Sequence, residues 1–205
     1  MRCTNVVMGW LIFFGMSYLQ ISQGSQPSIY KIEEDWELVI SEPDVASNSP
    51  QVTFSTYPSA DIDGSCFQLQ MNYAADTVFS AGGFHVAAVL NESMVDEARS
   101  ATRTVLSTNQ DTIRWTSIMA VIDGESLYAI KDGYGTQWGS FGGPEYLVRM
   151  FSSPAVDLSG YTPQKSLDAV DVGFGANRIT SITLRKVRSY YTDGQVDTVV
   201  LNQNP

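Results

Sequence analysis

Histidine and cysteine are scarce in this chain, which has one histidine and two cysteines among 205 residues. Zinc sites and disulfide frameworks use several such residues together, so neither is expected here. The lone histidine, His85, has no Gly-x-Ser-x-Gly serine to activate, so the usual signature of a serine hydrolase is missing. The glycine-rich loops that bind phosphates and dinucleotides are missing as well. The sequence therefore lacks the marks of several common enzyme classes, and it predicts no resident cofactor.

Basic residues are also few. Twelve Lys and Arg stand against 22 Asp and Glu, for a formal net charge of −10. An acidic surface repels nucleic-acid backbones and anionic lipids, so we expect no nucleic-acid partner. Four basic residues follow one another at mixed spacing near the C-terminus, namely Arg178, Arg185, Lys186 and Arg188. Such spacing is typical of the polar part of a strand.

The longest apolar run lies at the N-terminus. Residues 1–24 are predicted to be a secretory signal peptide with cleavage after Gly24. They begin with a positive region, continue with an apolar stretch and end with small residues. An uncleaved anchor is the alternative. Cleavage leaves residues 25–205 as a single domain without a membrane span, and we expect it to be secreted, periplasmic or on the cell surface. Its one cysteine is Cys66, so no internal disulfide is expected.

Alternating polar and apolar residues dominate the rest of the chain. Between residues 30 and 40 the apolar side chains share one strand face, and only Glu34 interrupts it. Further strands are predicted at 51–57, 66–73, 84–91, 111–122, 125–131, 145–151, 179–191 and 195–201. About nine or ten strands predict an all-β fold, a two-sheet antiparallel β-sandwich of the jelly-roll or concanavalin A-like type. A closed barrel is the second choice.

Asp-Gly pairs mark the predicted turns. Asp123-Gly124 joins two strands, and Asp193-Gly194 turns the last strand pair. Asp132-Gly133 is expected to end the strand that begins at residue 125. The segment 93–101 is the one helical candidate, and it is equally compatible with an irregular strand.

Three acids alternate on the polar face of the first strand: Glu33, Asp35 and Glu37. Their Glu-x-Asp-x-Glu pattern resembles the motif of retaining glycosidases with a concanavalin-like jelly roll. The resemblance implies that Glu33 is the nucleophile and Glu37 the acid/base, with Asp35 between them. The competing interpretation is the solvated face of an early strand, and we rank this non-catalytic interpretation first.

A second acidic motif, Asp61-Ile62-Asp63-Gly64, resembles half of a calcium-binding loop. The acidic residue that completes such a loop is replaced by Asn72, so a plain turn is the competing interpretation. Structural calcium held by Asp61 and Asp63 is left open.

The segment 133–146 interleaves aromatic residues with glycines. Exposed aromatic rings offer an apolar face to a sugar ring, and glycines let a ligand approach the backbone. The candidate ligand-binding residues are Tyr134, Gln137, Trp138, Phe141 and Tyr146. In the competing, structural interpretation the rings cover neighbouring glycines across a sheet.

Three blocks of the sequence, 29–38, 138–143 and 172–179, resemble a family of uncharacterised exported proteins associated with planctomycete bacteria. The resemblance implies export but no activity. More loosely, the Asp-Gly hairpins and the Gly-rich loop are similar to concanavalin-type sandwiches, whose members mostly bind glycans. The first hypothesis is therefore an exported, non-catalytic domain that binds polysaccharide or cell-envelope glycan. The second is a structural or interaction domain of the cell surface, and the third is a retaining glycosidase.

Overall fold

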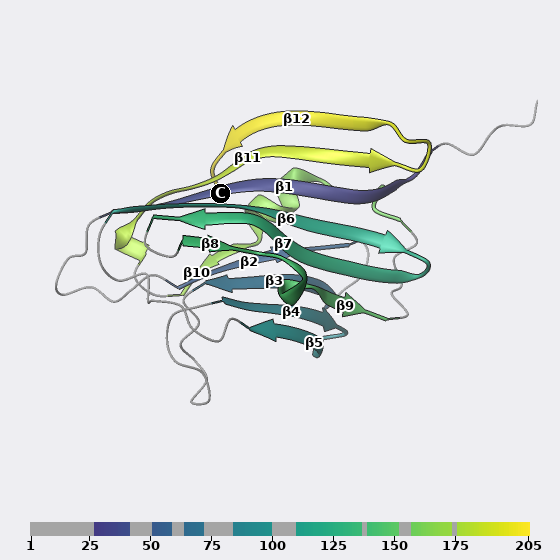
Figure 1. Ribbon diagram of the computed structural model, residues 1–205, viewed down its shortest axis with the longest axis horizontal. Helices are drawn as coiled ribbons and strands as arrows, with labels where there is room; N and C mark the ends of the chain where they lie inside the picture. The colour runs from purple at the N-terminus through teal and green to yellow at the C-terminus, as the bar shows by residue number, and fades with distance from the viewer. Residues whose placement is uncertain are drawn as a thin grey trace, which may run out of the picture.

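Two antiparallel β-sheets pack face to face and form the body of the protein (Figure 1). The computed structural model describes residues 27–41, 51–58, 64–71, 84–99, 110–136, 139–151, 157–173 and 176–205. Strands predominate in these residues, and the predicted all-β, two-sheet sandwich is confirmed. Among the described residues, none of the helices has the length and hydrophobicity needed to span a lipid bilayer.

The larger sheet has seven strands and the smaller sheet has five. The larger sheet runs in the order β12 (Val196–Gln203), β11 (Ile179–Tyr191), β1 (Ile29–Ile40), β6 (Asp111–Ile122), β7 (Glu125–Gly135) and β8 (Gly139–Phe141), and β9 (Val148–Met150) also pairs with β7. The smaller sheet runs in the order β10 (Val170–Val172), β2 (Val52–Thr56), β3 (Cys66–Met71), β4 (Phe84–Leu90) and β5 (Ser93–Arg99). The first strand, β1, therefore lies inside the larger sheet, between strands from distant parts of the chain.

Strand β1 alternates as predicted. Its even-numbered side chains from Ile32 onward are buried between the two sheets, so its odd-numbered side chains face away from the smaller sheet. Because directly paired residues share a face, Glu37 lies beside Arg114 of β6. By the same rule Asp35 lies between Thr116 of β6 and Lys186 of β11. The pairing thus gathers polar side chains from three strands on one outer face.

Aromatic rings join the two sheets in the centre of the core. Trp36 of β1 and Trp115 of β6 stack with their ring centroids 6.3 Å apart. The ring of Phe54, from β2 of the other sheet, meets them edge-on at 5.2 and 4.8 Å. Phe67 of β3 stacks on Tyr128 of β7 at 5.3 Å. The contacts of Phe54 and Phe67 cross from one sheet to the other, so the packing of the sandwich depends on them.

The only cysteine among the described residues, Cys66, is buried in β3 and is not in a disulfide. Burial raises the pKa of its thiol above the ordinary value. A buried thiol of this kind is chemically inert, and Cys66 serves as a small core residue.

A tight turn explains why the segment 93–101 is not a helix. Asn91 and Glu92 both have positive φ, at 50° and 63°, which is the geometry of a type I′ hairpin turn. The turn sends the chain back along β4 as β5, with Leu90 opposite Ser93. The helical alternative is therefore wrong for Ser93–Arg99, and the strand alternative is confirmed.

The two other predicted hairpins are confirmed. Asp123 and Gly124, with φ values of 52° and 80°, connect β6 to β7. Asp193 and Gly194 lie in the turn between β11 and β12, and the amide of Tyr191 donates to the carbonyl of Gln195 at 2.9 Å.

The prediction that Asp132-Gly133 ends its strand is wrong. β7 continues to Gly135, and its register against β6 shifts beside Asp132, whose φ is 52°. Such a shift is a β-bulge, in which one strand accommodates an extra residue. Phe141 lies directly opposite Gly133, where a Cβ atom would come within 2.3 Å of the Phe141 ring. Glycine at this position therefore makes room for an aromatic ring that covers it.

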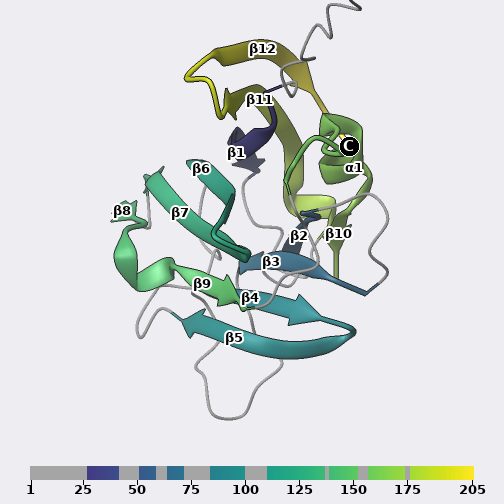
Figure 2. The same cartoon turned by 90° about the vertical axis from the view of Figure 1, so that its right-hand side faces the viewer.

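One short helix, α1 (Pro163–Asp168), lies beside the sandwich near β2 and β10 (Figure 2). It buries Ser166 and Leu167. Six residues are fewer than two helical turns, so no 3.6-residue period could reveal this helix in the sequence. The segment 145–151 was predicted as one strand, but it begins within a 3₁₀ turn, Pro144–Tyr146, and only Val148–Met150 is strand.

Candidate functional site

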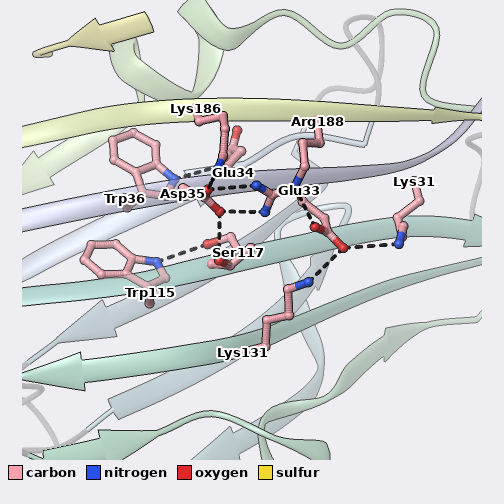
Figure 3. Close-up of polar contacts among 11 residues, drawn as sticks. Lys31, Glu33, Glu34, Asp35, Trp36, Trp115, Ser117, Lys131, Lys186 and Arg188 are labelled. Carbon is pink, nitrogen blue, oxygen red and sulfur yellow. Dashed lines mark hydrogen bonds and ion pairs between the residues drawn. The ribbon is translucent and has the colours of Figure 1, made fainter. Parts of the chain in front are cut away.

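A network of acids and bases covers the outer face of the larger sheet (Figure 3). Glu33 lies at its centre and is only 3% exposed. Lys131 Nζ of β7 and Lys31 Nζ lie 3.0 and 3.1 Å from its Oε1, and Arg188 Nε of β11 donates to its Oε2 at 2.9 Å. Burial by itself raises the pKa of Glu33, but the hydrogen bonds from these three cations outweigh it and lower the pKa to about 2. Glu33 is therefore a carboxylate at neutral pH.

Asp35 is clamped by the same arginine. Arg188 Nη1 and Nη2 donate to its two oxygens at 2.9 and 2.7 Å, and Lys186 Nζ lies 3.0 Å from Oδ2. Thr116 Oγ1 donates to Oδ1 at 2.8 Å. Burial opposes ionisation here as well, yet these partners lower the pKa of Asp35. All three nitrogens of the Arg188 guanidinium are thus engaged, one by Glu33 and two by Asp35.

Glu37 lies beneath two other arginines. Arg114 Nε donates to its Oε2 at 2.6 Å, and Arg185 Nη1 donates to its Oε1 at 2.9 Å. These two cations lower the pKa of Glu37 although its partial burial acts to raise it. The side chain of Glu37 is 11% exposed, whereas those of Arg114 and Arg185 are 68% and 49% exposed. The carboxylate is therefore covered by guanidinium groups that reach the solvent.

The prediction that the polar face of β1 is a solvated row of acids is wrong, because Glu33 and Glu37 are buried. Their burial also argues against catalysis. The acid/base of a retaining glycosidase needs a raised pKa, and the pKa values of Glu33, Asp35 and Glu37 are all lowered.

A shallow depression opens beside Asp35 on this face. It is lined by Asp35, Trp36, Arg114, Trp115, Thr116, Asp132 and Arg185. Next to it, Tyr134 pairs across the strands with Arg114 on one side and Ser140 on the other. The Tyr134 residue is 56% exposed. This corner of the sheet therefore combines an exposed aromatic ring with guanidinium, carboxylate and hydroxyl groups.

Two other aromatic residues of the Gly-rich segment belong to the core. Phe141 and Tyr146 are buried, and their rings lie 4.4 and 5.9 Å from the ring of Phe84. At these two positions the geometry favours the structural interpretation, in which aromatic rings pack over glycines. Tyr134 alone among the described candidates has a ring available to a ligand.

Gln137 and Trp138 lie outside the described residues, and so do the candidate calcium ligands Asp61 and Asp63. Within the described ranges, no group of three or more His, Cys, Asp or Glu residues is arranged to hold a metal ion.

Glu34 has a role that the sequence did not predict. Its side chain points into the sandwich, where the residue is 1% exposed. Trp36 Nε1 donates to its Oε2 at 2.9 Å, and the hydroxyls of Tyr161 and of Ser166 on α1 both donate to its Oε1. Burial raises the pKa of Glu34, and these hydrogen bonds offset the effect only in part. The only sequence signal was an acid within an apolar strand face.

We expect Glu34 to make the fold less stable as the pH rises. Its pKa is higher in the folded than in the unfolded chain, so it stabilises the fold fully below its ordinary pKa of 4.5. This contribution is lost as the pH rises through the folded pKa, by at most about 1.4 kcal/mol per pH unit. Glu34→Gln removes the titration, so its melting temperature should rise relative to that of the wild type as the pH increases. Thermal unfolding followed by circular dichroism at a series of pH values measures the difference.

Glu33→Gln is the matched control, because the pKa of Glu33 is shifted the other way. The stability from Glu33 is present above pH 4.5 and is lost as the pH falls through about 2, so the cost of Glu33→Gln should shrink in acid. If Glu34→Gln follows the wild type at every pH, Glu34 does not titrate as described.

No model of a known protein family matches this chain. No curated protein matches it significantly either.

Proposed function

We propose that this protein is an exported, non-catalytic β-sandwich domain that binds carbohydrate on the outer face of the larger sheet. The observation that carries the proposal is the Tyr134 ring, which is largely exposed beside the depression next to Asp35. A sugar ring has an apolar C–H surface and a rim of hydroxyls. Tyr134 offers a flat apolar partner for the first, and the side chains of Arg114, Thr116 and Asp132 offer donors and acceptors for the second.

The predicted signal peptide supports a location outside the cytoplasm, as a secreted, periplasmic or cell-surface protein. In such a place the abundant carbohydrates are polysaccharides and cell-envelope glycans, and these are the ligands that we propose. No cofactor takes part in the proposed binding.

We expect Tyr134→Ala to weaken polysaccharide binding about tenfold, since the loss of one stacking partner costs on the order of 1.4 kcal/mol. The protein beginning at Ser25 can be tested by affinity electrophoresis in gels that contain neutral or acidic polysaccharides. Phe151→Ala is the matched control, because Phe151 is 59% exposed but follows β9, whereas Tyr134 pairs directly with Arg114 of the depression. Both variants should melt within a few degrees of the wild type, as is usual for surface substitutions.

Two outcomes would contradict the proposal. In one, no polysaccharide retards the wild-type protein. In the other, the Phe151→Ala variant loses as much affinity as the Tyr134→Ala variant, which would show that the effect does not come from a site at Tyr134.

A structural or interaction domain is the second candidate, and one observation favours it. Strand β12 lies at the edge of the larger sheet and exposes Val196, Val199 and Val200, at 46%, 50% and 67%. An exposed edge strand with apolar side chains can pair with another chain. A mass measurement by light scattering separates the two candidates, because edge pairing predicts an assembly whereas the carbohydrate proposal needs only a monomer.

A further inference from the structure

The outer face of the larger sheet carries an excess of positive charge, although the chain as a whole is acidic. Among the described residues, strands β1, β6, β7 and β11 place six cations there: Lys31, Arg114, Lys131, Arg185, Lys186 and Arg188. They meet three carboxylates in the network, and Asp132 stands at the edge of the depression as a fourth acid. Arg149 and Glu125, which pair with each other on the same face, add one charge of each sign, so the described residues of this face keep a positive surplus on a chain of net charge −10.

The charges of this face are also layered. The carboxylate side chains lie beneath, at 4% exposure for Glu33, 24% for Asp35 and 11% for Glu37. The most exposed cations lie above them, with Arg114 at 68% and Arg185 at 49%. A ligand that approaches from the solvent therefore meets these guanidinium groups before it meets the carboxylates of Glu33, Asp35 and Glu37.

The arginines of this face differ in how many of their donors are engaged. Arg188 has all three guanidinium nitrogens bound to Glu33 and Asp35, so it is a structural clamp. Arg114, by contrast, donates to Glu37 through Nε, and Arg185 donates to Glu37 through Nη1. Within the described part of the chain, the terminal nitrogens of Arg114 and the Nε and Nη2 of Arg185 have no acceptor. A guanidinium has five N–H donors in a fixed fork, which fits the two oxygens of a carboxylate.

Glu37 fixes the position of both forks. It binds Arg114 of β6 and Arg185 of β11 at the same time, and it lies on the strand between them. The backbones of β6 and β11 are two strand spacings apart, or about 10 Å. Because Glu37 already holds both side chains in place, less side-chain entropy is lost when a ligand binds.

From these observations we propose that the ligand is a uronate polysaccharide, with Arg114 and Arg185 each binding a sugar carboxylate beside the Tyr134 ring. This inference rests on the proposed function and names the ligand class for the same site. A neutral glycan offers these guanidinium donors only hydroxyl oxygens, whereas a uronate chain offers planar carboxylates that match the fork, together with stacking faces.

The test compares two probes that share one backbone. Polygalacturonate carries free carboxylates, and its fully methyl-esterified form does not. We expect the protein beginning at Ser25 to bind polygalacturonate at least about tenfold more tightly than the ester, since each arginine–carboxylate fork contributes more than a neutral hydrogen bond. Raising the salt concentration from about 0.05 to 0.3 M should weaken this binding, because exposed charges are screened.

Variants identify the residues. Arg114→Gln and Arg185→Gln should each reduce polygalacturonate binding about tenfold and should weaken binding of the ester much less. Arg114→Lys keeps a positive charge that can still reach Glu37, but it lacks the paired donors of a guanidinium. This variant should fold normally and still bind polygalacturonate more weakly than the wild type. Arg149→Gln is the control, because Arg149 is 47% exposed on the same sheet but pairs with Glu125 and does not line the depression.

The outcomes separate this inference from the proposed function. If the ester binds as tightly as polygalacturonate and Tyr134→Ala weakens both, the carbohydrate site stands and the uronate inference is wrong. Non-specific charge attraction predicts that dextran sulfate binds as tightly as polygalacturonate and that Arg149→Gln weakens polygalacturonate binding as much as Arg114→Gln does. If both results are found, the uronate inference is wrong. If polygalacturonate, its methyl ester and the neutral polysaccharides all fail to bind, both proposals fail.

Discussion

Trp115→Ala is expected to lower the free energy of unfolding by about 3–5 kcal/mol, the usual cost of removing a large aromatic side chain from a core. Trp115 is 2% exposed. Its ring stacks on Trp36 and meets Phe54 of the other sheet, and its Nε1 donates to Ser117 Oγ at 3.2 Å. The substitution therefore removes packing between the two sheets and leaves a cavity where they meet.

Urea denaturation followed by circular dichroism measures this loss. Tyr134→Ala is the matched control, since it also removes an aromatic ring, but from an exposed position, and should cost within about 0.5 kcal/mol. Equal costs for the two variants would mean that the core does not depend on the contact between the sheets at Trp115.

Arg188→Met is the second substitution with a large expected effect, about 2–3 kcal/mol. Removing one partner of a fully buried ion pair typically costs about 3–5 kcal/mol, because an unpaired charge stays behind. The cost here is smaller, because Glu33 keeps Lys31 and Lys131, and Asp35 keeps Lys186 and is itself partly exposed. Methionine retains most of the apolar length of the arginine side chain, so packing changes little.

The pH dependence of the Arg188→Met variant distinguishes lost charge pairing from lost packing. The pKa values of Glu33 and Asp35 are lowered in the wild type, so their stabilising contribution is present at neutral pH and is lost in acid. The cost of Arg188→Met should therefore shrink as the pH falls toward about 3, whereas a packing defect would persist. Arg149→Met, which removes an exposed pair with Glu125 at 3.7 Å, should cost at most about 1 kcal/mol at any pH.

The strands could be predicted because their signal is local. In β1 the alternation of polar and apolar side chains is complete within the strand itself. In the β6–β7 hairpin the alternating segments directly flank the Asp123-Gly124 turn. Errors arose where one local pattern has two outcomes. An Asp-Gly pair can reverse a chain, as at Asp123, or form a bulge within a strand, as at Asp132, and the partner strand decides between them. For Gly133 that partner is Phe141 on β8, which only the folded sheet places opposite it.

The candidate site was less predictable, because its contacts are long-range. The acids at 33, 35 and 37 were recognised, but their environment was not. Glu33 is bound by Lys131, 98 residues away, and by Arg188, 155 residues away. No pattern near Glu33 indicates that these strands lie beside β1, so an acid on the polar face of a strand looked solvated. For Glu34, likewise, the partners Tyr161 and Ser166 come from the region of α1, which showed no helical period.

The stacked tryptophans also have an optical consequence. Trp36 and Trp115 are two of four tryptophans in the chain, and their ring planes lie within 9° of parallel. Two indoles held so close couple their electronic transitions, so the folded protein should show an exciton pair in its circular dichroism that vanishes on unfolding. Because the Trp36 N–H donates to Glu34, loss of the proton from that carboxyl group should also shift the fluorescence emission of Trp36. An unlabelled sample thus reports by light alone whether the two tryptophans of the larger sheet are stacked and whether Glu34 beside Trp36 is charged.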